Sequence, residues 1–189
     1  MGSRSLVVGG LLGPAAFVGA WTVGGALDSG YSPIEDAISR LAAVDADGAS
    51  RALMTAGFVA FGVGVPLYGL ALRSRLAGPA WAAAVTTGLA TLGVAATPLE
   101  VSPTVSLLHG AFATTGYASL ALVPLLSAPG LRAQGRPGLA RLATAAGVAS
   151  GICLAATVAG PAHGLFQRLG LTIGDAWIAG TALALRDHH

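Results

Sequence analysis

The chain has 189 residues, of which 10% are charged and 54% hydrophobic, and its mean hydropathy is +0.73. Soluble domains carry roughly 25% charged residues, so this composition excludes an ordinary water-soluble fold and indicates a surface that largely faces lipid. The net charge of +2 comes from ten scattered arginines against eight acidic residues, a pattern that does not indicate nucleic-acid binding.

Six apolar stretches predict six membrane-spanning helices, each close to the ~20 residues that a crossing requires. The whole chain, residues 1–189, is therefore expected to form one all-α domain, a six-helix transmembrane bundle. The first stretch has a longer apolar run than a signal peptide, so we expect it to be retained as a helix. The expected helices cover about residues 5–27, 52–72, 80–98, 106–128, 142–162 and 169–185.

The first loop is predicted to contain a short amphipathic helix over residues 32–42. Ser32 is followed by proline and, three residues after the cap, by Glu35, which is a capping box with proline at the first helical position. Asp36 and Arg40 have the spacing of an i,i+4 ion pair. We therefore expect a helix that lies on the bundle or on the lipid headgroups. Its apolar positions share one face: Ile34, Ala37, Ile38 and Leu41.

The arginines predict the orientation, because seven fall on one side of the expected topology and three on the other. By the positive-inside rule both termini are cytoplasmic and the first loop is outside, in the plasma or inner membrane of the cell. The seven are Arg4, Arg73, Arg75, Arg132, Arg136, Arg141 and Arg186, and the three are Arg40, Arg51 and Arg168.

The few polar side chains gather at the outer ends of the helices in this topology. Asp175 lies about ten residues into the last helix, where an acid is costly unless it is protonated, paired or beside water. We expect it to face the bundle interior, opposite His109 and Tyr117. A purely structural role, as interhelical hydrogen-bonding groups, is equally open for His109 and Asp175. The candidate pocket residues are Asp36, Arg40, Glu100, His109, His163, Arg168 and Asp175.

Two histidines and several carboxylates on one side suit a transition metal, which makes His109 and His163 the candidate metal ligands. The ligands would come from separate segments, so their spacing is not diagnostic. The sequence has no phosphate loop, dinucleotide fingerprint, nucleophile elbow or His-Glu-x-x-His motif. It therefore assigns no catalytic residue and no cofactor beyond this candidate metal ion.

The first loop reads Gly30-Tyr31-Ser32-Pro33 and, further on, Ile38-Ser39-Arg40-Leu41-Ala42. In these residues the chain resembles the domain-of-unknown-function family 998 of bacterial and archaeal integral membrane proteins. It implies a multi-span bundle in a membrane and brings no activity, so it supplies no catalytic residues. Further agreement lies at Gly13-Pro14, Trp21, Glu100, His109, His163-Gly164, Phe166-Gln167-Arg168 and Asp175.

Two functions remain open at this stage. The first is an integral membrane protein with an outward-facing polar pocket that binds a lipid headgroup or a small polar molecule. The alternative is a membrane-embedded hydrolase of lipid esters or amides, in which a metal held by His109, His163 and a carboxylate activates water. A small transporter is disfavoured because no two matching broken helices occur. Membrane lipids are the expected partners, and no protein partner is indicated.

Overall fold

The computed structural model describes residues 3–186 and confirms the all-α fold, with six α-helices and one short 3₁₀ helix. All six expected helices are present, and their ends differ from the prediction by up to six residues. α6 differs most, because it begins at His163 rather than near residue 169. The elements are α1 (Ser3–Leu27), η1 (Ile38–Ala42), α2 (Gly48–Arg73), α3 (Ala80–Ala96), α4 (Pro103–Ala133), α5 (Pro137–Ala159) and α6 (His163–Arg186).

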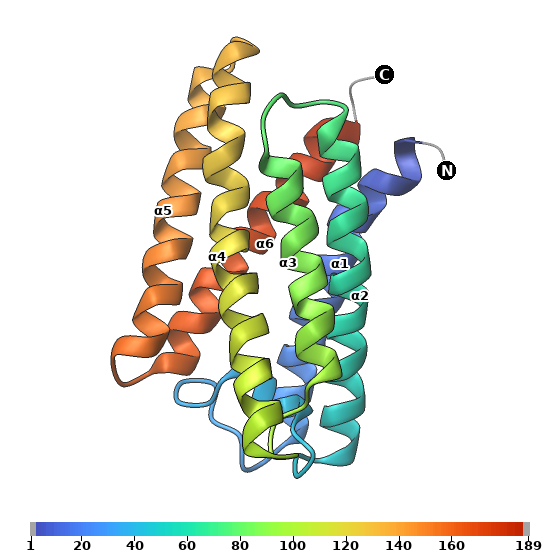
Figure 1. Ribbon diagram of the computed structural model, residues 1–189, viewed down its shortest axis with the longest axis vertical. Coiled ribbons are helices and arrows are strands. Elements are labelled where there is room, and N and C mark those ends of the chain that lie inside the picture. Colours follow the sequence, from blue (N-terminus) through green and yellow to red (C-terminus); the bar gives the residue numbers. More distant parts are fainter. Residues whose placement is uncertain (1–2, 187–189) are drawn as a thin grey trace.

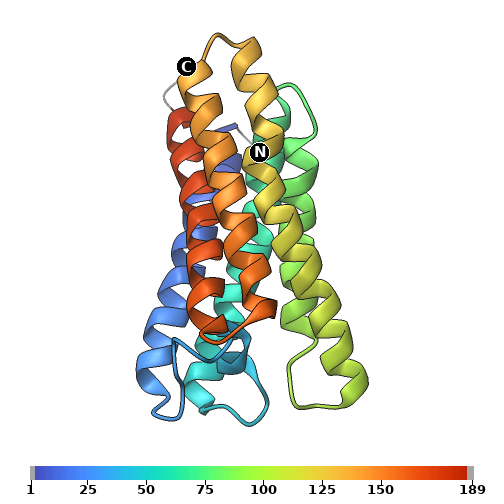
Figure 2. The ribbon, with the colours of Figure 1, turned by 90° about the vertical axis from the view of Figure 1, so that its left-hand side faces the viewer.

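The six helices run alternately up and down, and each packs against the next in the chain (Figures 1 and 2). α6 returns beside α1 and also contacts α4, so the helices form a closed bundle. Residues 28–47, 97–102 and 160–162 lie at one end, which we call the loop end. The beginning of α1, the end of α6 and the two remaining turns lie at the opposite end, which we call the terminal end (Figure 1).

Four helices are long and apolar enough to cross a membrane: α1 from Val8, α2, α4, and α5 as far as Val158. α3 is apolar but has 17 residues. α6 is long enough, but it carries Gln167, Arg168 and Asp175, which lower its hydropathy although all three are buried. These three polar residues of α6 therefore face the bundle.

Small residues bring the helices into close contact. A Cβ atom on Gly9 of α1 would overlap the carbonyl oxygen of Gly64 of α2, and one on Gly88 of α3 would overlap the ring of Pro66. Helix backbones approach this closely only where one partner has no side chain. The α1–α2–α3 side of the bundle is therefore held at short interaxial distance by these positions.

The helix predicted over residues 32–42 is only partly formed. Its N-cap is confirmed, because the Ser32 hydroxyl accepts a hydrogen bond from Glu35 N at 3.3 Å. The continuous helix is wrong: residues 33–35 form only a turn, the chain is extended at Ala37, where ψ is 146°, and the helical part of this segment is η1. Two backbone groups that would pair with each other in a continuous helix, Ile34 O and Ile38 N, are instead hydrogen-bonded to α6. Leu165 N donates to Ile34 O at 3.0 Å, and Ile38 N donates to the side chain of Gln167 instead of to that oxygen.

Candidate functional site

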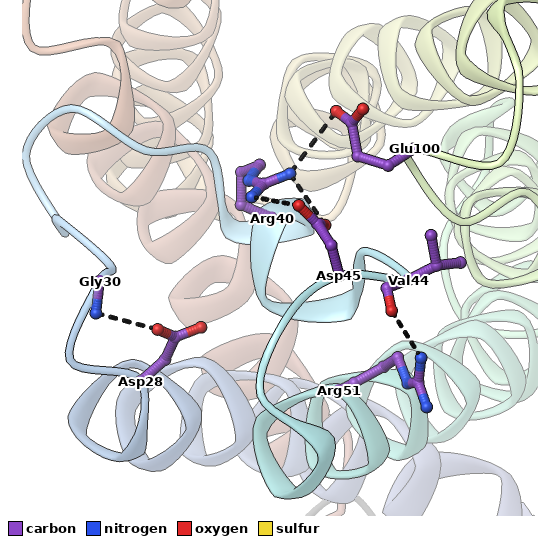
Figure 3. Close-up of polar contacts among 7 residues, drawn as sticks. All are labelled: Asp28, Gly30, Arg40, Val44, Asp45, Arg51 and Glu100. Atoms are coloured by element: carbon purple, nitrogen blue, oxygen red, sulfur yellow. Dashed lines mark hydrogen bonds and ion pairs between the residues drawn. The ribbon is translucent and has the colours of Figure 1, made fainter.

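A water-exposed ion-pair network connects the first loop to the segment between α3 and α4 (Figure 3). Arg40 contacts Asp45 at 3.2 Å and Glu100 at 3.5 Å. The predicted pair of Arg40 with Asp36 is wrong, because the Asp36 carboxylate instead accepts a hydrogen bond from Ser32 N at 2.7 Å. The hydrogen bond from Arg40 lowers the pKa of Asp45. These exposed side chains fasten two loops together and do not line an interior site.

Backbone contacts reinforce the same junction. Val44 N donates to Leu99 O at 3.2 Å, and the Arg51 guanidinium donates to Val44 O at 2.8 Å (Figure 3). At the start of the loop, Gly30 N donates to the Asp28 carboxylate at 3.0 Å. The first loop is thus tied down along its length.

Arg168 of α6 is the buried cation that holds the first loop against the bundle. The guanidinium nitrogen Nη1 donates to Pro33 O at 2.7 Å and to Asp36 O at 3.0 Å, and Nη2 donates to the Tyr31 hydroxyl. The guanidinium also lies over the rings of Trp21 and Tyr31, at 5.5 and 5.2 Å. Its charge is therefore stabilised by carbonyl dipoles and aromatic faces, and no carboxylate in residues 3–186 forms an ion pair with it.

Gln167 and Gly164 complete this junction, and neither was among the predicted site residues. The Gln167 side chain accepts from Ile38 N at 2.7 Å and donates to the Tyr117 hydroxyl. A Cβ on Gly164 would overlap Asp36 O, so the loop can lie on α6 only because this residue is glycine. The run Phe166-Gln167-Arg168 was noticed in the sequence, but nothing local showed that its amide would contact the first loop.

A cavity lies beneath the first loop, between η1 and helices α1, α2, α3, α4 and α6. The centre of a water-sized molecule has about 50 Å³ of room in it, and the empty space of about 500 Å³ around this volume includes open solvent. Its walls are mainly aromatic and aliphatic, so it is an apolar cavity with a few polar groups. Four phenylalanines, Phe17, Phe58, Phe61 and Phe112, contribute to the wall. The polar lining residues are Ser39, Thr87, Thr91, His109, Tyr117 and Gln167.

His109, which lines this cavity, has one unpartnered polar atom. The ring is 5% exposed, and Nδ1 lies 2.7 Å from the carbonyl oxygen of Thr97. Because a carbonyl can only accept, the geometry assigns the hydrogen to Nδ1 and leaves a lone pair on Nε2 in the neutral ring. Nε2 is buried and has no hydrogen-bond partner in the described part of the chain. A residue of the cavity wall therefore has a fixed hydrogen-bond acceptor with no donor.

The chain matches the family model described as "Protein of unknown function (DUF998)" over residues 11–184. The chain belongs to this family. The match runs from α1 to α6, so the resemblance seen in the first loop extends over the whole bundle. No curated protein and no solved structure matches the chain.

Of the seven predicted pocket residues of this DUF998 chain, His109 alone lines the cavity described above. Asp175 faces the interior as expected, at 3% exposed, but it does not line the cavity, and both its carboxylate oxygens lack a partner among residues 3–186. The reason is its depth: it follows Gln167 by eight residues, or about 12 Å along α6. It therefore lies beyond the part of α6 that reaches His109 and Tyr117.

The two predicted metal ligands of the DUF998 chain also lie in different surroundings. His109 lines the cavity, whereas His163, the half-buried first residue of α6, does not. Within residues 3–186, no group of three or more His, Cys, Asp or Glu side chains is arranged to hold a metal ion together. The Nδ1 atom of His109 is engaged by Thr97, so this imidazole has a single nitrogen, Nε2, without a partner in the described residues.

Proposed function

We propose that this DUF998 protein is a multi-pass protein of the cell membrane whose aromatic cavity binds a small amphipathic molecule with an uncharged hydrogen-bond donor. The observation that carries the proposal is the buried, unpartnered Nε2 atom of His109 among phenylalanine side chains. The proposal keeps the small-molecule pocket expected from the sequence and changes its chemistry from polar to largely apolar.

The membrane arrangement follows from the direction of the helices. α6 reaches from the loop end to the terminal end, as do the apolar helices α1 and α5, which run antiparallel to it (Figure 1), and its residues Gln167, Arg168 and Asp175 are buried. We infer that α3 and α6 cross the membrane together with the four longer apolar helices. All six helices would then span the bilayer.

The arginines support cytoplasmic termini. At the loop end Arg168 is buried against the first loop, so only Arg40 and Arg51 reach the surface there. Five arginine side chains are described at the terminal end: Arg73, Arg75, Arg132, Arg136 and Arg141. The positive-inside rule assigns the more basic end to the cytoplasm, which puts the cavity in the outer half of the membrane.

The chemistry of the lining indicates the kind of ligand. Buried polar atoms are normally hydrogen-bonded, so the lone pair of His109 favours a donor such as a hydroxyl group. Arg168 and the carboxylates do not line the cavity, so nothing there would neutralise a charged headgroup. The phenylalanines suit an aliphatic or ring-shaped body. A neutral long-chain alcohol has both features and serves as the probe.

The test is photolabelling with decanol that carries a diazirine in its chain, on protein reconstituted in lipid nanodiscs. We expect labels on Phe58, Phe61 or Phe112 that excess unlabelled decanol suppresses. His109→Asn keeps a donor for Thr97 and removes the Nε2 acceptor, so it should reduce labelling about 3- to 10-fold, the effect of losing one hydrogen bond. The matched control is Leu108→Asn, on the neighbouring exposed residue of α4, which should leave cavity labelling unchanged.

Labels confined to lipid-facing residues such as Leu107 and Leu108 would contradict the proposal. So would cavity labelling that His109→Asn leaves at the wild-type level, because the acceptor would then have no part in binding.

A further inference from the structure

Asp175, halfway along α6, is a buried acid that neither the loop junction nor the cavity of His109 uses. Its side chain is 3% exposed, and neither carboxyl oxygen has a hydrogen-bond partner among residues 3–186. The interhelical hydrogen bond that would give it a purely structural role is therefore not formed in the described part of the chain. Buried polar groups are normally paired, and an unpaired acid inside a membrane bundle indicates a function such as proton relay.

No described positive charge lies near the middle of the bundle to neutralise Asp175. The elements that pack against α6 are α1, α2, α4, α5 and η1. The described side chains of α1 include no ionisable group. Within the spans of α2, α4 and α5, Tyr68 is bonded to Thr181, Tyr117 to Gln167 and His109 to Thr97, and Cys153 is a half-buried thiol.

The cations of these elements lie in η1 or near the helix ends. They are Arg40, Arg51, Arg73, Arg132 and Arg141. On α6 itself, His163 and Arg168 belong to the first six residues, and Arg168 is bound to the first loop. An ionised carboxylate at the position of Asp175 would lose its hydration with nothing in return. The Asp175 carboxyl therefore carries its proton in this structure.

Asp175 lies between two hollows that admit water from opposite ends of the bundle, because α6 runs from one end to the other (Figure 1). Leu171, one turn before it, lines the cavity beneath the first loop. A second hollow, which we call the terminal hollow, lies between α2, α4, α5 and α6 at the terminal end, and Thr181 lines it. The centre of a water-sized molecule has about 50 Å³ of room in the cavity and about 30 Å³ in the terminal hollow. Along α6, Asp175 is about 6 Å from Leu171 and about 9 Å from Thr181.

The two sides differ in what separates Asp175 from water. On the cavity side, Leu120 and Leu171 are both buried and both belong to the cavity wall. On the terminal side, the Thr181 hydroxyl lies 2.6 Å from the hydroxyl of the buried Tyr68, and either oxygen can be the donor. A hydroxyl group can accept one proton while it gives up another, whereas a leucine side chain can do neither. A proton therefore has polar carriers on the terminal side alone of these two.

We propose that Asp175 is a reversible proton-binding site in the middle of the bundle, loaded and unloaded from the terminal hollow through Thr181 and Tyr68. Loading moves one proton from water to the carboxylate and cancels its charge, and unloading returns that proton to water. The two hydroxyls gain and lose a proton in the same event, so their own protonation does not change. The orientation proposed above makes the terminal end cytoplasmic. The site itself depends neither on that orientation nor on a ligand at His109, so failure of either proposal leaves the other standing.

Infrared difference spectroscopy of the full chain in lipid nanodiscs follows this carboxyl group directly. Subtraction of the Asp175→Asn spectrum from that of the wild type isolates the C=O stretch of Asp175, because the amide is neutral and has nearly the same shape. We expect a carboxylic-acid band near neutral pH that a carboxylate band replaces, reversibly, at alkaline pH. An acid band that persists at every pH at which the protein stays folded would overturn the proposal, as would a carboxylate band at neutral pH.

The route is tested by timing the shift of the acid band after transfer to D₂O. Thr181→Val keeps the shape of the side chain, removes its hydroxyl and should slow the exchange about tenfold or more, because a positioned proton carrier is lost. Tyr68→Phe should have the same effect. Thr91→Val is the matched control, because it removes a hydroxyl from the wall of the cavity instead, and it should leave the rate unchanged. Wild-type exchange in both Thr181→Val and Tyr68→Phe would overturn the proposed route, as would equal slowing by Thr91→Val.

Discussion

The imidazole of His109, on α4, donates a hydrogen bond from Nδ1 to the carbonyl oxygen of Thr97, the residue that ends α3, over 2.7 Å. The bond satisfies a carbonyl at a helix C-terminus, where no intrahelical donor remains. It also fixes the orientation of the ring and leaves the other nitrogen, Nε2, without a partner. The two ring nitrogens of His109 thus differ in role: Nδ1 binds Thr97, and Nε2 is an unused acceptor. Substitution by asparagine or glutamine distinguishes these roles.

The first prediction compares the stability of the two amide variants at position 109. Asn at position 109 places an amide N–H near the position of Nδ1 and retains the bond to Thr97, whereas Gln places its amide near Nε2 and loses that bond. We expect His109→Gln to lower the free energy of unfolding by about 1 kcal/mol and His109→Asn to lower it less. Chemical unfolding of the detergent-solubilised protein measures the difference, and the reverse order would show that Thr97 is not the partner that matters.

The second prediction concerns the loop junction at Arg168. Arg168→Lys keeps the charge but cannot reach Pro33, Asp36 and Tyr31 together, since an ammonium lacks the planar fork of a guanidinium. We expect a loss of about 2–4 kcal/mol of stability, because buried carbonyl groups lose their donors. Amide hydrogen exchange should rise most in residues 31–42. Arg51→Lys, which removes an exposed contact to Val44 O, is the control. An equal effect from this variant would contradict the claim that Arg168 holds the first loop against the bundle.

The third prediction uses the strained residue before α6. Ala162 has a φ of 61°, a left-handed conformation that costs a residue with a Cβ roughly 1–2 kcal/mol and glycine little. Ala162→Gly should therefore raise the free energy of unfolding by about 1 kcal/mol. Ala149→Gly, in the interior of α5, should lower it by a similar amount. Thermal unfolding of the two variants should give midpoints shifted in opposite directions, and a shared direction would contradict this reading of the turn.

The fourth prediction is a pH dependence of the exposed pair of Arg40 and Asp45. The hydrogen bond from Arg40 lowers the pKa of Asp45 below its value in the unfolded chain, about 3.9. The stabilisation is therefore fully present above that value and is lost as the pH falls through the lower folded-state pKa. The stability difference between wild type and Arg40→Gln should shrink as unfolding is measured from pH 6 toward pH 3. A difference that grew on acidification would have the wrong sign.

Hydrophobic length alone was enough to predict six helices, because an apolar stretch of about 20 residues is a local property. The start of α6 was missed since His163, Gln167 and Arg168 look like loop residues in a sequence. In the structure Gln167 and Arg168 are buried because they bind the first loop. The same contacts explain the break at Ala37, where α6 takes the backbone groups that local helix signals assign to the loop. These contacts join segments that are far apart in the sequence, so no local sequence pattern reveals them.

The cavity was harder to predict than the bundle. Phenylalanine side chains such as Phe58 and Phe61 do not stand out in a chain that is 54% hydrophobic, and which helix faces meet depends on packing. His109 was found because an ionisable residue in an apolar helix is conspicuous. The same rule selected Asp175, which is buried but lies outside the cavity.

The most direct test of the cavity acceptor is ¹⁵N NMR of protein labelled at histidine and reconstituted in lipid nanodiscs. The His109 signals are assigned by their loss in His109→Asn, and His163→Asn identifies the other helical histidine. The account predicts a protonated Nδ1 and an unprotonated Nε2, and saturating decanol should shift only Nε2 toward the value of a hydrogen-bonded imine. A proton on Nε2, or an Nε2 signal that decanol leaves unchanged, would contradict the proposed function.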